Sequence, residues 1–236
     1  MKNAVVLVSG GMDSVVLAHY LKKKEKLDNL LLVFIDYGQQ SFEEEKFCVE
    51  NTVKELGAEL KIIDAKWLGK ISTSMINKKI DEEKLKGIEK EDEIISWYVP
   101  CRNALFLLMG LAIAESEFIS KKEKYGVYIG IKYEGELQFK DTTPEFVGEM
   151  NKLVNFCTQE GNLKFVAPFL EKEKEEVIEL AKELEVGLEK TYSCYVGRGF
   201  DENKIPIHCG ICGSCKARKK AFKFSEIKDP TIYKNV

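Results

Sequence analysis

Strand-like segments alternate with segments of helical period over residues 5–131. Apolar runs occupy residues 5–8 and 30–35, and further strands are predicted at 60–63 and 125–131. Continuous apolar runs of this length are typical of strands that are covered on both faces. Between them, apolar side chains at helical spacing predict helices from Val15 to Leu21 and over 43–56, with Gly57 ending the second. This alternation predicts an α/β fold with a doubly wound, mostly parallel sheet.

The remaining pattern adds a central helix and further elements. Residues 104–114 are almost wholly apolar, which predicts a helix that is buried all round and packed against the sheet. Another helix opens at about Pro144, with Asp141 or Thr143 as its cap. Residues 66–95 show little clean period and predict a surface excursion of helix and loop, to which we assign no role. The pattern also predicts a short strand and an amphipathic helix, at 163–168 and 172–184.

Composition separates a large first part from a small second one. The 236 residues are 44% hydrophobic, enough to bury one sizeable core and a small appendage. From residue 191 cysteines stand among Gly, Ser and Pro, so we expect a domain at 1–190 and a small module at 191–236. The net charge of −3 gives no bulk attraction for nucleic acid or anionic membranes. No apolar run approaches a membrane span and no leader precedes the first strand, which predicts a cytoplasmic protein.

The most informative segment joins the first strand to the first helix and reads Ser9-Gly10-Gly11-Met12-Asp13-Ser14. The two glycines let the backbone turn sharply, so successive N–H groups point at one phosphate while the helix adds its positive dipole end. The serine hydroxyls are further donors, and Asp13 either caps the helix or holds a metal bound to the phosphates. The segment lacks the ending of a Walker A loop and the spacing of a dinucleotide fingerprint. An ordinary strand-to-helix turn is the alternative.

Other polar segments follow strands of the same sheet. Ligands bind beyond the carboxyl ends of parallel strands, so side chains that follow different strands are expected to meet there. Arg102 and Asn103 precede the apolar helix, where an arginine holds a phosphate bidentately and an asparagine caps the helix or binds the ligand. A structural arginine paired with a core carboxylate is the alternative. Besides the first loop, the candidates for cofactor binding at this edge are Asp36, Tyr37, Gly38, Gln39, Arg102, Asn103, Lys132 and Asp141.

Seven cysteines, an odd number clustered near the C-terminal end, favour metal binding over disulfides. Cys209, Cys212 and Cys215 form two overlapping C-x-x-C units, and Cys194 lies 15 residues upstream of the first. Four thiolates make a tetrahedral structural zinc site, although consecutive C-x-x-C units also ligate iron–sulfur clusters. His208 is an alternative ligand beside these thiolates. The other cysteines are expected to be buried in helices, at Cys48 and Cys157, or to line the pocket, at Cys101.

Together these motifs resemble those of the 7-cyano-7-deazaguanine synthases (QueC or ExsB), a family of ATP pyrophosphatases. The matching segments lie at 9–14, 36–39, 98–103, 143–146, 191–195 and 209–218, followed by Ala221 and Phe222. The resemblance implies an ATP-dependent carbon–nitrogen ligase that uses ATP, Mg²⁺ and Zn²⁺.

In that family the carboxylate of 7-carboxy-7-deazaguanine is adenylated, ammonia displaces AMP, and a second activation dehydrates the amide to the nitrile. By this resemblance the catalytic residues are Ser9, Asp13, Ser14 and Arg102, which act by position and charge. Proteins of this fold class often form homodimers, which we expect here too.

Three segments depart from the family pattern. Residues 133–142 replace a stretch associated with reading the base, and the loop from Cys194 to Cys209 and the segment 66–95 are longer than usual. A related enzyme that stops at the amide, or joins the activated acid to an amine on another molecule such as a protein, is therefore one alternative. A tRNA-modifying adenylating enzyme is a second, although the acidic net charge makes nucleic acid an unfavoured partner. A non-catalytic nucleotide-binding scaffold is the last.

Overall fold

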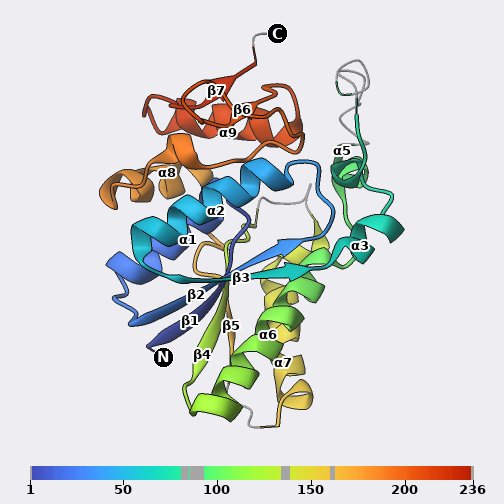
Figure 1. The fold of residues 1–236 in the computed structure, drawn as a ribbon, viewed down its shortest axis with the longest axis vertical. Helices are drawn as coiled ribbons and strands as arrows, with labels where there is room; N and C mark the ends of the chain where they lie inside the picture. The colour runs from blue at the N-terminus through green and yellow to red at the C-terminus, as the bar shows by residue number, and fades with distance from the viewer. Residues whose placement is uncertain (1, 81–84, 86–92, 134–138, 160–162, 235–236) are drawn as a thin grey trace.

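Five parallel strands form one sheet in the order β3-β2-β1-β4-β5 in the computed structural model, which describes residues 2–80, 85, 93–133, 139–159 and 163–234 (Figure 1). The strands are β1 Asn3–Leu7, β2 Asn29–Asp36, β3 Glu59–Asp64, β4 Tyr125–Ile129 and β5 Phe165–Val166. The chain winds from β1 through β2 to β3 and then crosses to β4 on the other side of β1. This confirms the doubly wound parallel sheet, with its switch point beside the carboxyl end of β1.

Helices cover both faces of the sheet, with α1 and α2 on one face and α6 and α7 on the other (Figure 1). α8 packs on α1 and on α9, so these helices extend the first layer. The helices are α1 Met12–Lys23, α2 Phe42–Leu56, α3 Lys66–Ile71, α5 Glu93–Trp97, α6 Arg102–Lys121, α7 Pro144–Cys157, α8 Lys174–Glu183 and α9 Gly213–Phe224. Three single turns are η1 Met75–Asn77, η2 Lys140–Thr142 and η3 Leu188–Lys190. Gly57 ends α2 in the left-handed conformation, as expected.

Alternate residues of the central strands pack into two cores. Val5 and Leu7 of β1 belong to the core beneath α6, whereas Val6 belongs to the core beneath α1. Val33 and Phe34 of β2 divide in the same way. Both strands are therefore covered on two faces, as their apolar runs predict.

β3 forms where the third strand is predicted, but it is not covered on both faces. It is the edge strand, its residues are half-buried or exposed, and Ile62 is 46% exposed. The pattern of residues 60–63, which includes Lys61, indicates that a strand forms but does not say how many neighbours the strand will have.

α6 is packed against the sheet as expected, but it is not buried all round. Leu107, Leu111 and Ala114 face β1 and β4, whereas the outer residues are half-buried or exposed and Ile119 is 57% exposed. The stretch Ile95–Lys121 is long and apolar enough to cross a membrane by length and composition alone, and 33% of its most apolar window is buried. α6 belongs to an outer helix layer, so part of its apolar surface has no further layer over it.

Cysteines outside the metal motif follow the prediction in one case and not in another. Cys48 is buried in α2, but Cys157, which was expected to be buried, is exposed at the end of α7. Of the 66–95 excursion, α3, η1 and the start of α5 show the mixed helix and loop that its pattern predicts, and residues 81–84 and 86–92 lie outside the described chain.

The C-terminal module (residues 191–236) packs on the larger part through α9. Ala221 and Phe222 of α9 join the core that α1 forms with the sheet. Two short strands, β6 Ile207–His208 and β7 Ile232–Tyr233, pair in parallel beside α9 (Figure 1). Because this module shares a core with the rest, the division at residue 190 stays a prediction.

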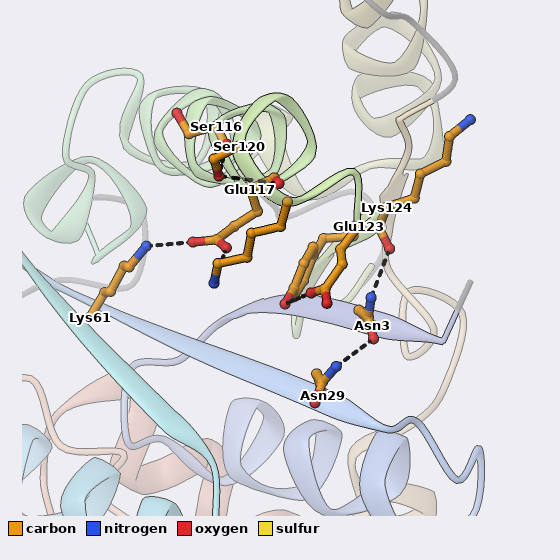
Figure 2. A network of polar contacts seen from close by, with 10 residues as sticks. Asn3, Asn29, Lys61, Ser116, Glu117, Ser120, Glu123 and Lys124 are labelled. Atoms are coloured by element: carbon orange, nitrogen blue, oxygen red, sulfur yellow. Dashed lines mark hydrogen bonds and ion pairs between the residues drawn. The ribbon is translucent and has the colours of Figure 1, made fainter.

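Polar side chains join the amino ends of the strands (Figure 2). Asn29 Nδ2 donates to Asn3 Oδ1 at 3.0 Å, and Asn3 Nδ2 donates to the Lys124 carbonyl at 3.5 Å. Nearby, Glu117 of α6 pairs with Lys61 of β3 at 3.0 Å. This end of the sheet is thus fastened by polar groups that satisfy one another.

Candidate active site and metal centre

The loop of residues 9–14, which we call the phosphate loop, is held in shape by its own hydroxyls. Ser14 Oγ accepts from Ser9 N at 3.1 Å and donates to the Gly11 carbonyl at 3.0 Å. Ser9 Oγ accepts from Gly11 N at 3.3 Å. Gly11 is the N-cap of α1, and no side chain of the described residues caps that helix. Uncapped N–H groups and the positive end of the α1 dipole are the features by which a helix start can bind an anion.

Glycines allow the phosphate loop to lie between neighbouring elements. Gly10 has φ +74°, and a Cβ there would lie 2.4 Å from the Glu45 carbonyl oxygen of α2. A Cβ on Gly130, after β4, would lie 3.1 Å from Ser14 Cα. A side chain at either position would crowd the neighbouring backbone, so both positions favour glycine.

Asp13 carries an unsatisfied oxygen at the mouth of the phosphate loop. Its Oδ1 is buried and has no hydrogen-bond partner among the described residues. A buried carboxylate oxygen without a partner is destabilising, so its presence fits a cation or donor that arrives with the ligand.

A cavity of about 280 Å³ opens beside the phosphate loop, at the carboxyl ends of the central strands. The predicted residues that line it are Ser9, Gly11, Met12, Asp13, Ser14, Tyr37, Arg102, Asn103 and Cys194. The structure therefore brings the phosphate loop, the start of α6 and the C-terminal module to one space. Cys101, expected to line this pocket, is exposed and lies outside its lining.

Arg102 presents its cation to the cavity. Its Nε lies 3.4 Å from Asn103 Oδ1, and its Cζ lies 5.8 Å from the centre of the Tyr37 ring. Burial alone would lower the pKa of Arg102, but Tyr37, Tyr195 and Asp141 together raise it. Within the described chain no carboxylate forms an ion pair with this guanidinium, which favours a ligand anion over the structural alternative.

Glu45 of α2 also lines the cavity, although the sequence did not single it out. Its carboxylate accepts from Ser41 Oγ at 2.6 Å and from Gln39 Nε2 at 2.9 Å. Burial nevertheless raises the pKa of Glu45 to about 7. Standing beside Glu43 and Glu44, it looks in sequence like part of a solvated helix face.

Three other predicted residues shape the turn after β2 and do not line the cavity. Asp36 accepts from Gly38 N at 3.1 Å and pairs with Lys66 at 3.1 Å. Gln39 accepts from Tyr37 N at 2.9 Å, which holds Tyr37 at the cavity wall. Direct binding of a cofactor by Asp36, Gly38 or Gln39 stays a prediction.

Asp141 lies at the start of α6. Its Oδ2 accepts from Asn103 N at 3.4 Å, and Asn103 Nδ2 donates to the Asp141 carbonyl at 3.2 Å. Of the two candidate caps for α7, the structure selects Thr143, whose hydroxyl accepts from Phe146 N at 3.1 Å. Asp141 thus supports Asn103, and its contact with a cofactor stays a prediction.

Lys132 follows β4, and its Nζ donates to the Lys172 carbonyl at 2.6 Å. It does not line the cavity, so its place in the cofactor site also stays a prediction. Of the segment 133–142, residues 134–138 lie outside the described chain.

The C-terminal module supplies cavity residues that sequence reasoning missed. Tyr192, Ser193 and Tyr195 line the cavity, as does Lys174 at the start of α8. The segment 191–195 matches a family motif, but nothing in its spacing predicts that it lies against the phosphate loop. Tyr195 packs on Trp97, with ring centres 4.8 Å apart.

The four predicted ligand thiols converge beneath this wall. The Sγ atoms of Cys194, Cys209, Cys212 and Cys215 are buried and lie within 4.8 Å of one another. Cys209 and Cys215 are 3.9 Å apart, close to the separation of about 3.8 Å that a tetrahedral zinc–thiolate site requires. The donor set therefore fits one metal ion.

His208 is not part of this ligand group. Its Nε2 accepts from Ser193 N at 3.1 Å, and its ring lies between Tyr192 and Tyr233. Burial lowers the pKa of His208 to about 3, so the ring is neutral and able to accept that hydrogen bond. Among the described residues, the group able to hold a metal ion is therefore the four cysteines.

Comparison with known proteins decides the family. A family model described as "Queuosine biosynthesis protein QueC" matches residues 3–226. The chain belongs to the QueC family. This confirms the resemblance carried by its motifs and its assignment as an ATP-dependent ligase.

QueC relatives match along their whole length. The 7-cyano-7-deazaguanine synthase of Methanobrevibacter smithii is 32% identical, over 98% of this chain and 98% of its own. That of Campylobacter fetus subsp. fetus is 30% identical, over 100% of this chain and 99% of its own. The relatives do not favour the alternatives to a QueC synthase.

Solved structures are more distant from this QueC chain. The U34-tRNA thiolase NcsA from Methanococcus maripaludis is 20% identical with a TM-score of 0.40, and the match covers 81% of this chain and 60% of that one.

Proposed function

We propose that this protein adenylates the carboxylate of 7-carboxy-7-deazaguanine with ATP, substitutes nitrogen from ammonia, and completes 7-cyano-7-deazaguanine with a second ATP. The observation that carries the proposal is a single cavity that three features bound. They are the phosphate loop before the uncapped α1, Arg102, which forms no ion pair with a carboxylate of the described residues, and a wall from the C-terminal module. Membership of the QueC family and the printed names of its relatives support this choice of substrate.

The phosphate loop would act on the first step by position and charge. The substrate carboxylate oxygen attacks the α-phosphorus of ATP, and the bond from that phosphorus to the bridging oxygen of the β-phosphate breaks. Pyrophosphate leaves, and the N–H groups of residues 12–14 in the first turn of α1, with the dipole of that helix, stabilise its negative charge. Ser9 and Ser14 keep the loop in the shape that aims those groups.

Arg102 would stabilise anionic oxygen at the reacting centre, with Asn103 beside it. Ammonia attacks the acyl carbon, AMP leaves with the carbon–oxygen electron pair, and a proton passes to solvent. In the second round the amide oxygen attacks another ATP, again releasing pyrophosphate. Loss of AMP and the remaining protons on nitrogen forms the nitrile.

We assign Mg²⁺ to the unsatisfied oxygen of Asp13, and when bound it neutralises charge on the phosphates. We assign Zn²⁺ to the four cysteines. Their spacing supports a single ion, because a cluster of several irons places iron and sulfide atoms between its thiolates and holds them farther apart. The metal site would hold the cavity wall and take no part in the chemistry.

The direct test incubates the protein with ATP, 7-carboxy-7-deazaguanine and ammonium, with product identified by mass spectrometry. We expect the nitrile, accompanied by AMP and pyrophosphate. Accumulation of the amide alone would replace this proposal with a related enzyme that stops at the amide or transfers the acid to another amine, including one on a protein. Retention of tRNA at physiological salt with no deazapurine product would favour the tRNA-modifying alternative.

We also propose that the protein is a cytoplasmic homodimer formed through the outer faces of α6 and α7. Phe156 of α7 is 86% exposed and Ile119 of α6 is 57% exposed. The chain just after α7 contacts α6 where Gln159 N donates to Glu115 Oε1 at 2.5 Å. Large exposed apolar side chains of this kind are candidates for a protein contact. By light scattering we expect Phe156→Glu to give monomers and the control Phe224→Glu, 60% exposed on α9, to stay dimeric; a monomeric unmodified protein would contradict this.

A further inference from the structure

Arg218 of α9 is fully buried without a carboxylate partner in the described chain. Its Nε donates to Thr231 Oγ1 at 2.7 Å, and Nη2 donates to the Leu188 carbonyl at 2.8 Å. Its Nη1 donates to the hydroxyls of Thr191 and Ser193, at 2.9 and 3.0 Å. A buried cation is destabilising unless hydrogen bonds satisfy it, and here neutral oxygens do so. Three of these four oxygens belong to one short segment, 188–193.

The two hydroxyls that this arginine holds flank a residue in contact with the phosphate loop. Between Thr191 and Ser193 lies Tyr192, whose N–H donates to the Gly10 carbonyl at 2.8 Å. The Tyr192 carbonyl lies 3.5 Å from the position that a Cβ on Gly11 would take. The backbone of Tyr192 therefore rests against the phosphate loop at two successive residues.

The direction of the Gly10 carbonyl sets the direction of the next N–H group. Because the peptide is planar and trans, the Gly10 carbonyl and the Gly11 N–H point in opposite directions. With the carbonyl held by Tyr192, the Gly11 N–H lies on the side of Ser9 Oγ, 3.3 Å away. Glycine permits many backbone conformations, so this orientation needs an external hydrogen bond to select it.

We propose that Arg218 is a positioning residue for ATP: it holds Thr191 and Ser193 so that Tyr192 keeps the Gly10–Gly11 peptide in the orientation in which the Gly11 N–H donates to Ser9 Oγ and the phosphate loop keeps its shape. The inference rests on the proposed function, since it takes ATP as the phosphate ligand. It assigns Arg218 no contact with ATP, and its effect passes through two hydroxyls and one backbone hydrogen bond.

The variants separate this role from general stability. Arg218→Lys keeps the charge but cannot reach all four acceptors, and Arg218→Gln removes the charge. Thr191→Val removes one acceptor and leaves the arginine in place, and Thr191 does not line the cavity. Lys219→Met is the matched control, because Lys219 on the same helix donates to the Gly210 carbonyl at 3.0 Å, in the loop between two metal ligands.

The measurement is the Kd for ATP by calorimetry on metal-loaded protein, with metal content, the KM for ATP, the KM for the carboxylate substrate and kcat. We expect Arg218→Lys to weaken ATP binding about tenfold, as for loss of a hydrogen bond to a charged group. Arg218→Gln is expected to weaken it further and Thr191→Val less. The metal content and the KM for the carboxylate substrate are expected to stay unchanged, and Lys219→Met to match the unmodified protein.

Unchanged ATP affinity in Arg218→Lys, or equal losses for ATP and the carboxylate substrate, would overturn the inference. If the arginine variants do not fold, Thr191→Val decides, and unaltered ATP binding in it counts against the proposal. If the unmodified protein binds ATP but forms no deazapurine product, the proposed function fails while the titration still judges Arg218. An unmodified protein that binds no ATP would overturn both.

Discussion

The two ends of the sheet hold carboxylates in opposite ways. At the carboxyl end Glu45 lies beside the cavity, and burial raises its pKa to about 7. At the amino end Glu117 pairs with Lys121 at 2.7 Å and Lys61 at 3.0 Å, and these cations lower its pKa (Figure 2). The charge of Glu117 therefore favours the folded state, whereas that of Glu45 opposes it. Of these two carboxylates, the one whose charge weakens the fold lies at the end where the ligand is proposed to bind.

The largest contrast is expected between aspartates at the two ends. Asp13→Ala removes the unsatisfied oxygen at the phosphate loop, and we expect AMP release to fall by about a hundredfold or more with an unchanged melting temperature. Asp28→Ala, which removes an exposed carboxylate 3.8 Å from Lys2 at the amino end, is expected to leave both unchanged. AMP assays and calorimetric melting check the pair. Normal turnover in Asp13→Ala would refute the role of the phosphate loop.

The metal is expected to stabilise the protein through the four cysteines, near the carboxyl end of the sheet, and not through thiols elsewhere. Cys212→Ser should lose the bound ion and lower the melting temperature by several degrees, because structural zinc contributes folding free energy directly. Cys157→Ser, at an exposed thiol on α7, is expected to keep the metal and the melting temperature. Elemental analysis and calorimetry provide the readouts, and a Cys212→Ser protein with one ion per chain and normal melting would contradict the assignment.

Two glycines with positive φ separate strain from function. Gly10→Ala places a Cβ 2.4 Å from a backbone oxygen, so we expect weaker ATP binding, by about tenfold, together with lower stability. Gly57→Ala has open space around its Cβ and φ +59°, so it is expected to cost only about 1 kcal/mol of unfolding free energy and leave ATP binding intact. ATP titration and denaturant unfolding measure both. Equal ATP affinities in the two variants would remove the distinction.

The smallest effect is the pH dependence of stability. Because the pKa of Glu45 is raised in the folded protein, its contribution to the free energy of unfolding is full below about pH 4.5 and is lost as the pH rises through about 7. The lowered pKa of Glu117 gives the opposite, a contribution present above about pH 4.5 and lost as the pH falls. Relative to the unmodified protein, the melting temperature of Glu45→Gln should rise from pH 4.5 to 7. The melting temperature of Glu117→Gln should lie below that of the unmodified protein above about pH 4.5 and approach it as the pH falls further. Parallel curves for all three proteins would show that neither carboxylate is shifted.

Much of the fold follows from the sequence because strand burial and helix caps are local signals. The runs containing Val6 and Val33 predict the central strands, and Gly57 predicts the end of α2. The exposure of Ile62 and Ile119 was not predictable, because it depends on which elements have no neighbour beyond them. The local pattern predicts which element forms but not how many other elements cover it.

For the candidate site, too, residues in local motifs could be predicted, whereas residues brought in by tertiary packing could not. Ser9 to Ser14 and the four cysteines are continuous or closely spaced motifs, and the structure brings each set together. Glu45 and Tyr192 reach the cavity from a charged helix and from the start of the C-terminal module, and no short spacing announces either. Topology alone predicts Lys132 and Asp141 at this edge. In the structure Asp141 contacts Asn103 of the cavity lining, whereas Lys132 bonds to the Lys172 carbonyl, which does not line the cavity.

The hydrogen bond from Tyr192 to Gly10 also orders events in time. During synthesis Gly10 is made early, while Tyr192, Arg218 and Thr231 come late. The sheet strands precede α9, and nascent chains fold from the N-terminal side first. A growing chain can therefore assemble its sheet before it can finish its phosphate loop. If Arg218 holds the phosphate loop as proposed, the nucleotide site is completed last, and the chain is expected to use ATP only after α9 has been translated.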